Sequence, residues 1–293
     1  MRLVSFAQDG QARLGVERPD GRILPTGDLG SGVPGTMEAL LAGGDAALAA
    51  LRSAVAGASP SATTLDPTSV TVLAPVPRPG KVIAIGLNYF DHAKEGGVEP
   101  PAEPMLFAKF TTSVVGPGAM VEWDPDLTGS VDLEAELGVV IGRTARRVPE
   151  ADALSYVLGY TCVNDVSARD LQKSDKQFVR AKSLDTFCPM GPVLVTSDDI
   201  PDPQRLAIKG IRNGVANQDS DTSQMIFGVA SIVAFCSRAF TLEPGDVIAT
   251  GTPAGVLVYQ DPPERLRDGD VVTIDIEGIG SLTNPCREVR PAS

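Results

Sequence analysis

Short apolar segments rich in β-branched residues recur from residue 81 onward. They lie at residues 82–85, 137–141, 156–163, 193–195, 247–249 and 271–276. Turn-forming sequences such as Asn213-Gly214 separate them. Short segments of this composition, bounded by such turns, are typical of β-strands. We therefore predict a predominantly β domain with strands lining a central site and one clear helix, at residues 223–239.

The first 75 residues show a different pattern, in which short strands precede a helical segment. Strands are expected at residues 3–6, 13–16 and 23–24. A helix is expected over residues 36–55, with Thr36 as its N-cap and with Gly43-Gly44 dividing it in two. The proline-rich stretch at residues 75–79 is the best domain boundary. We predict an α+β chain, with a small N-terminal domain over residues 1–75 and a mostly β domain over residues 76–293.

The charge balance limits the partners of the protein. Lysine and arginine total 25 and aspartate and glutamate total 37, which gives a net charge of −12. Nucleic-acid binding needs a clustered basic face, and the sequence contains no such cluster. We therefore expect no nucleic-acid partner.

Cysteine usage and hydropathy predict the compartment. The four cysteines are widely spaced and form no CxxC pair, which is typical of reduced, buried thiols. The N-terminus lacks the apolar core of a secretory signal, and the sequence contains no uninterrupted apolar run long enough to cross a bilayer. We expect a cytoplasmic protein with no membrane partner.

Two carboxylates stand where an apolar strand begins. Glu134 and Glu136 run directly into the segment 137–141. Side chains at i and i+2 of a strand share a face, about 7 Å apart, so this pair can converge on one cation. The alternative is the solvated face of an amphipathic strand.

Asp165 ends the segment 160–164 and opens the polar run 166–172. It is a third candidate carboxylate, and the alternative is a helix N-cap. Arg169 and Gln172 have the i, i+3 spacing of one helix face, and can equally be surface residues.

His92 is the single histidine of the chain. If its segment is helical, His92 meets Glu95 at i, i+3, and the carboxylate can orient the imidazole and raise its basicity. An isolated histidine is more often structural or exposed. The flanking Gly86 and Gly96-Gly97 would let the segment move as a flap.

The donor types indicate the class of metal. One histidine and cysteines without zinc spacing exclude a typical zinc site. Three carboxylates provide the oxygen ligands that Mg²⁺ or Mn²⁺ prefers, with Ca²⁺ as a further option. The sequence holds no phosphate-binding glycine loop, GxSxG elbow or dinucleotide fingerprint.

A series of ordered motifs runs from about residue 76 to the C-terminus. They are Gly86-Leu87-Asn88-Tyr89 with Asp91-His92, Phe107-Ala108-Lys109, and residues 132–137, 164–170, 180–187, 244–248, 250–256 and 278–284. Together these motifs resemble the fumarylacetoacetate hydrolase family. The resemblance implies a mixed β-roll catalytic domain and a homodimer. Residues 1–75 resemble the small extra domain of many bacterial members.

The resemblance also implies roles for individual residues. Glu134, Glu136 and Asp165 match the metal ligands, and His92 with Glu95 matches a catalytic pair on a short lid. The remaining matches are Lys182 beside the metal-bound substrate, Arg169, Gln172 and Thr252 in the pocket, and, more weakly, Gln218 and Thr222. Some members add a metal-binding aspartate shortly before the histidine, where this chain has residues 85–87, so we expect three protein carboxylates.

The expected activity follows from the same resemblance. It implies a hydrolase that cleaves a C–C bond of an acylpyruvate or 2,4-diketo acid and releases pyruvate or a related keto acid. His92, polarised by Glu95, would activate water, and Lys182 would stabilise developing negative charge. The alternatives are an isomerase that tautomerises a 2-hydroxy-dienoate, an oxaloacetate decarboxylase at the same site, and a catalytically silent metal-binding homodimer.

Overall fold

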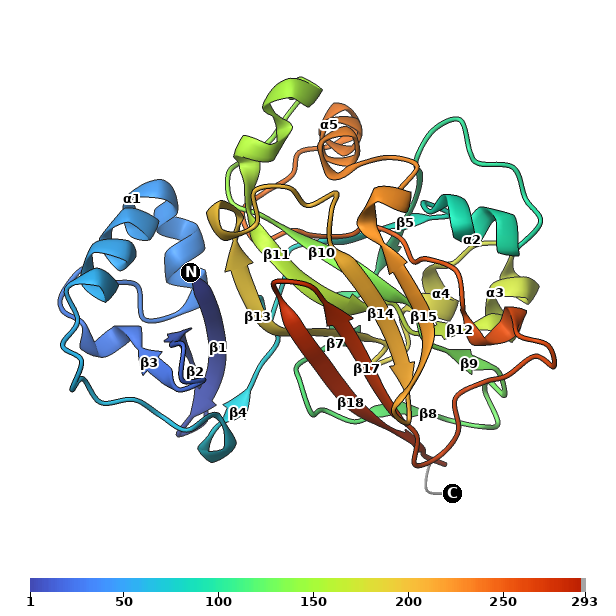
Figure 1. Ribbon diagram of the computed structural model, residues 1–293, viewed down its shortest axis with the longest axis horizontal. Coiled ribbons are helices and arrows are strands. Elements are labelled where there is room, and N and C mark those ends of the chain that lie inside the picture. Colours follow the sequence, from blue (N-terminus) through green and yellow to red (C-terminus); the bar gives the residue numbers. More distant parts are fainter. Residues whose placement is uncertain (291–293) are drawn as a thin grey trace.

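The computed structural model describes residues 1–290, and residues 291–293 of the predicted second domain lie outside the described residues. The fold is α+β and mostly strands, as predicted (Figure 1). The described helices are α1 (Met37–Ala56), α2 (Phe90–Glu95), α3 (Arg169–Asp175), α4 (Val179–Lys182) and α5 (Val229–Ala239), with 3₁₀ turns between elements.

An eleven-stranded sheet forms the centre of the molecule, in the order β3-β2-β1-β13-β11-β10-β16-β5-β6, with β4 on β1 and β7 on β13. Its strands are β1 (Arg2–Gln8), β2 (Gln11–Glu17), β3 (Ile23–Pro25), β4 (Thr71–Val72), β5 (Val82–Gly86), β6 (Met105–Lys109), β7 (Val114–Val115), β10 (Ala135–Ile141), β11 (Val157–Asn164), β13 (Cys188–Thr196) and β16 (Val247–Ala249). Every residue of β10 and β11 is buried. Strands covered on both faces need continuous apolar runs, which explains the pattern in the sequence.

A second sheet packs across the central strands of the first. It has five strands in the order β15-β14-β17-β18-β8. They are β8 (Val121–Trp123), β14 (Ala207–Arg212), β15 (Val215–Asp221), β17 (Val271–Ile276) and β18 (Gly280–Glu288). Because β14, β17 and β18 contact β10, β11 and β13 respectively, the two sheets enclose the main apolar core. A short pair, β9 (Val131–Asp132) with β12 (Ser167–Ala168), lies beside the candidate site.

The N-terminal strands continue the large sheet. β1 pairs antiparallel with β13, with Leu3 opposite Leu194, so the elements at the left of Figure 1 share backbone hydrogen bonds with the strands at its centre. Two ion pairs add to this connection, Arg52 with Asp198 and Arg143 with Asp45. The chain enters the second part through the proline-rich stretch, and the boundary at residue 75 stays a prediction.

α1 confirms two local predictions. The Thr36 side chain accepts a hydrogen bond from the amide of Ala39, as an N-cap does, and Gly44 has non-helical torsion angles (φ 54°, ψ −139°) that kink the helix. The predicted helix at residues 223–239 is shorter, because it begins at Val229. The preceding residues pair instead with the segment before α2, through a bridge between Met225 and Tyr89 and a bond from Ile226 to Asn88.

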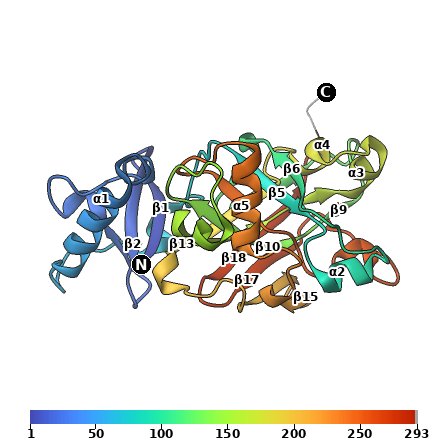
Figure 2. The same ribbon diagram turned by 90° about the horizontal axis from the view of Figure 1, so that it is seen from above.

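α1 is also long and apolar enough, by length and composition alone, to cross a membrane. A single helix of this kind is weak evidence for a membrane span, and the expectation of no membrane partner stays a prediction. In the fold α1 buries Met37, Leu40 and Leu51 in a core cluster with the strands beside it. Its break at Gly44 interrupts the backbone hydrogen bonds that a lipid-exposed helix needs. The arrangement in Figure 2 is that of a helix packed on the N-terminal strands. The cytoplasmic location stays a prediction.

The sheet connection predicts a stability effect. Leu3 is fully buried, and Leu3→Ala should lower the free energy of unfolding by about 2–5 kcal/mol because it leaves a cavity between β1 and its neighbours. Denaturant unfolding followed by circular dichroism measures this. Val215, 64% exposed, supplies the control Val215→Ala, for which we expect little change. Equal small effects in both variants would contradict the tight packing of the N-terminal strands.

Candidate active site

Antiparallel pairing of β10 with β11 brings the three predicted carboxylates together. Ala135 lies opposite Asn164, so Glu134 and Asp165 are neighbours at the ends of the two strands. The amide of Asp165 donates to the carbonyl oxygen of Glu134 at 2.9 Å. Glu136 follows two residues later on the same face of the strand. One oxygen from each of the three buried side chains lies within 4.8 Å of the others.

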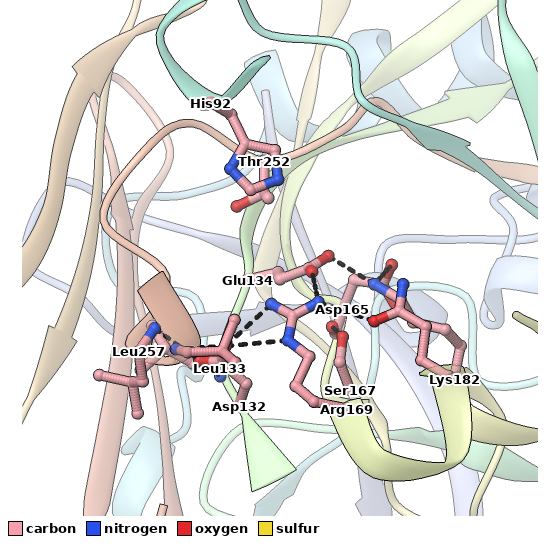
Figure 3. A network of polar contacts seen from close by, with 12 residues as sticks. His92, Asp132, Leu133, Glu134, Asp165, Ser167, Arg169, Lys182, Thr252 and Leu257 are labelled. Atoms are coloured by element: carbon pink, nitrogen blue, oxygen red, sulfur yellow. Dashed lines mark hydrogen bonds and ion pairs between the residues drawn. The ribbon is translucent and has the colours of Figure 1, made fainter. Parts of the chain in front are cut away.

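Three cationic side chains surround this cluster, and Figure 3 shows two of them, Lys182 and Arg169, beside Glu134 and Asp165. The Lys182 ammonium bridges Glu134 at 2.5 Å and Asp165 at 2.8 Å. Lys109 contacts the other oxygen of Asp165, and the Arg169 guanidinium lies 2.6 Å from Glu134. All three cations are enclosed by the fold. Buried charges are costly unless they are paired, so the cations and carboxylates depend on each other.

The cationic side chains pair with Glu134 and Asp165 but not with Glu136. Burial opposes ionisation of Glu134, but Lys182 and Arg169 outweigh it and lower its pKa to about 2. Burial, and then the neighbouring Asp165 and Glu134, raise the pKa of Glu136 well above its usual range. Its hydrogen-bond partner is the amide of Gly251 at 2.8 Å, and Glu136 forms no ion pair within residues 1–290. Glu136 is therefore the carboxyl group of the cluster that lacks a cationic partner.

This donor set fits a divalent metal. Oxygen donors from three carboxylates match Mg²⁺, Mn²⁺ or Ca²⁺, and a cation beside Glu136 would supply the missing positive charge. His92 and the cysteines are not part of the cluster, and the cysteines are buried and free, which agrees with the prediction of reduced thiols.

A second buried network, missed in the sequence, supports Glu134. Asp132 pairs with Arg169 at 2.9 Å and accepts hydrogen bonds from the amides of Leu257 and Val258. It thus connects the carboxylate cluster with the 3₁₀ turn Leu257–Tyr259. Asp132 stands two residues before Glu134 in the sequence, and this alternation of acidic residues could have identified it as a further site residue. Lys109 was also missed, although it lies in one of the motifs.

His92 and Glu95 meet on α2, as their spacing predicted. Nδ1 of His92 lies 3.3 Å from a carboxylate oxygen of Glu95, whose other oxygen accepts from the amide of Gly255 at 2.9 Å. Gly255 has φ +102°, and a Cβ there would lie 2.0 Å from the carbonyl oxygen of Asn217. The turn that holds Glu95 therefore requires glycine.

Contacts from distant segments hold α2 in place. Asp91 accepts a hydrogen bond from Ser220 at 2.5 Å, and the side chain of Asn88 bonds to backbone atoms of Thr250 and Phe227. The Tyr259 ring lies beside His92, with ring centroids 5.8 Å apart. The predicted lid is thus a helix packed over the pocket.

One cavity of about 410 Å³ joins these groups, a size typical of small-molecule sites. Its lining includes most of the predicted residues, namely His92, Glu134, Glu136, Arg169, Gln172, Lys182 and Thr252. Glu95 and Asp165 are not in this lining: Asp165 is buried behind it, and Glu95 is partly exposed at the surface. Gln218 also lies behind the lining and donates to the hydroxyl of Thr252 at 2.7 Å. Thr222 is outside the cavity lining, and its hydroxyl accepts from the amide of Leu206.

Comparison with known proteins identifies a family and several relatives that are similar to this chain. The family described as fumarylacetoacetate (FAA) hydrolase C-terminal matches residues 81–287. The mitochondrial oxaloacetate tautomerase fahd2 of Xenopus laevis is 42% identical over 97% of this chain and 90% of its own length. Oxaloacetate tautomerase YisK of Bacillus subtilis is 48% identical over 73% of this chain and 72% of its own length.

Two solved structures share the fold. Fumarylacetoacetate hydrolase from Exiguobacterium antarcticum is 41% identical, with a TM-score of 0.83, and the match covers 99% of this chain and 100% of that one. Maleylpyruvate hydrolase from Sphingobium sp. SYK-6, in complex with manganese (II) ion and pyruvate, is 31% identical, with a TM-score of 0.81 and the same coverage.

The unequal charge distribution predicts how the site responds to metal. Saturating Mg²⁺ or Mn²⁺ should raise the melting temperature of the wild type, by the equivalent of about 2.7 kcal/mol at one hundred times Kd. Glu136→Gln should lose this stabilisation, while the metal-free variant stays at least as stable because burial and the neighbouring carboxylates already oppose ionisation of Glu136. Differential scanning fluorimetry with a metal titration measures both. The exposed Glu99 supplies the control Glu99→Gln, and a full metal response in Glu136→Gln would contradict the metal site.

The Asp132 network predicts a structural cost. Asp132→Ala leaves Arg169 with one carboxylate fewer and leaves buried amides without an acceptor, so we expect a loss of about 3–5 kcal/mol in the free energy of unfolding. Asp132→Asn keeps one acceptor and should cost less. Denaturant unfolding measures this order, with the exposed Asp126 as the control Asp126→Ala. If both Asp132 variants are as stable as the control, the network does not stabilise the site.

Proposed function

This chain belongs to the fumarylacetoacetate hydrolase family, and from that premise we propose that it is a divalent-metal-dependent tautomerase. Its substrate would be a small 2-oxo acid of the oxaloacetate type, interconverted between enol and keto forms. The observation that carries the proposal is the match to oxaloacetate tautomerases from a vertebrate and a bacterium, in one case along almost the whole chain. The sequence had favoured a hydrolase, and the comparisons favour its isomerase alternative.

The reaction moves one proton. A C–H bond at C3 breaks and an O–H bond at C2 forms, or the reverse, and no other atom is gained or lost. A metal held by Glu134, Glu136 and Asp165 would act as a Lewis acid on the substrate's carbonyl oxygen. The protein must then remove and return a proton at C3 and stabilise negative charge at the oxygen.

Lys182 is suited to stabilising that charge. Burial opposes its protonation, but Asp165 and Glu134 outweigh burial and raise its pKa, so the side chain stays an ammonium. The Phe107 ring, with its centroid 5.3 Å from the nitrogen, covers it on one side. A fixed cation in a site that excludes water stabilises a developing anion strongly.

His92 is suited to the proton transfer. It supplies the one imidazole of the cavity lining, and imidazole is the side chain most often used for general acid–base catalysis. Glu95, fixed by the amide of Gly255, orients the ring through Nδ1, which leaves Nε2 as the nitrogen that exchanges the proton. Tyr259 packs beside the ring and limits its access to solvent.

A hydrolase remains the second candidate, because the same His92–Glu95 pair can activate water and a maleylpyruvate hydrolase shares the fold. Hydrolysis requires a diketo acid and releases two products. An oxaloacetate decarboxylase would release pyruvate and carbon dioxide, and a silent metal-binding protein would do neither. The homodimer implied by the family resemblance stays a prediction.

One assay separates these functions. With Mg²⁺ or Mn²⁺, the protein should accelerate the decay of the oxaloacetate enol absorbance without forming pyruvate, and EDTA should stop it. His92→Ala should lower kcat for tautomerisation by about 10²-fold, at the low end for a general base, because exchange with water partly replaces it. Glu95→Gln should have a smaller effect in the same direction.

The outcome on other substrates decides the alternatives. Pyruvate from acetylpyruvate or fumarylpyruvate, with no effect on the oxaloacetate enol, would establish the hydrolase. Pyruvate from oxaloacetate would establish the decarboxylase. A wild-type tautomerase rate that His92→Ala leaves unchanged would overturn the role given to His92.

A further inference from the structure

The cavity has three cationic side chains in its lining, and two of them are already paired. Arg169 forms ion pairs with Asp132 and Glu134, and Lys182 forms them with Glu134 and Asp165. The third is Lys173. Within residues 1–290 its side chain forms neither an ion pair nor a hydrogen bond, so its charge is available to a ligand.

α3 presents Lys173 on the same side as the other pocket residues. Arg169, Gln172 and Lys173 have the i, i+3 and i, i+4 spacing of one helix face, and all three line the cavity. The Arg169 guanidinium donates to the Gln172 side chain at 3.2 Å, which fixes this face toward the cavity. Lys173 is exposed, unlike the buried Lys182, and so lies nearer the solvent.

The charges of the centre explain what Lys173 can bind. Asp132, Glu134, Glu136 and Asp165 carry four negative charges once the metal ligands are ionised, and Lys109, Arg169 and Lys182 balance three of them. A divalent cation would leave the centre with one positive charge, which the carboxylate next to the 2-oxo group neutralises. A second carboxylate on the substrate therefore finds no counter-charge at the centre.

The rest of the wall offers that second carboxylate little help. It is largely apolar, with Leu87, Val98, Phe178 and Val258 among its residues, and an unpaired carboxylate against such a wall is costly. We propose that Lys173 binds the distal carboxylate and makes the site selective for dicarboxylic 2-oxo acids over monocarboxylic ones. This inference rests on the proposed function and adds the class of substrate to it.

The test compares a dicarboxylic with a monocarboxylic 2-oxo acid. Lys173→Met keeps the length of the side chain and removes its charge. We expect it to raise KM for oxaloacetate at least 10-fold, with kcat within about 3-fold of the wild type, and to leave unchanged the inhibition constant of pyruvate, a monocarboxylic 2-oxo acid. Lys173→Arg should restore most of the oxaloacetate affinity. Lys176→Met, an exposed lysine outside the cavity lining, is the matched control.

A binding measurement gives a second readout that does not depend on turnover. Calorimetry in the presence of Mn²⁺ should show weaker oxaloacetate binding in Lys173→Met and unchanged pyruvate binding. Wild-type protein that neither binds nor converts any 2-oxo acid would overturn the proposed function and this inference with it. Wild-type activity on oxaloacetate combined with unchanged KM and Kd in Lys173→Met would overturn the inference alone, as would an equal loss for both acids.

Discussion

The site depends on the burial of three carboxylates between paired strands. The core buries Glu134, Glu136 and Asp165. Any one of these carboxylates, ionised and unpaired, would destabilise the fold, because an isolated buried charge costs several kcal/mol or more. Pairing of β10 with β11 fixes their backbone positions, and Lys109, Lys182 and Arg169 offset most of their charge. The compensation is incomplete at Glu136, and that deficit makes the cluster suited to a divalent cation.

The surrounding polar contacts connect the carboxylates with the lid residues. Through Arg169, Asp132 links Glu134 to the turn that carries Tyr259. Gln218 bonds to both the amide of Ala135 and the hydroxyl of Thr252, and Gly255 of the same loop holds Glu95. A shift in one element therefore changes the metal ligands and the His92–Glu95 pair together, because the intervening groups are buried and hydrogen-bonded.

The sequence predicted the local features and missed those that depend on packing. Strand composition located β10 and β11, and the two-residue period placed Glu134 and Glu136 on one face. Neither pattern reveals that Lys109, more than 50 residues away from Asp165, is buried against it, since strand order is a tertiary property. The helix predicted from residue 223 begins later, because Met225 and Ile226 bond to the segment before α2. Long-range pairing of this kind overrides local propensity.

The two sides of the cavity have different physical constraints. The strand side is buried, and its carboxylates are paired with cations except at Glu136. Substitutions there therefore disturb the charge pairing and the stability of the core together. The helical side, formed by α2 and α3, carries the buried His92 and the exposed Lys173. A substitution on these helices can therefore change which ligand the cavity accepts while the three carboxylates keep their positions.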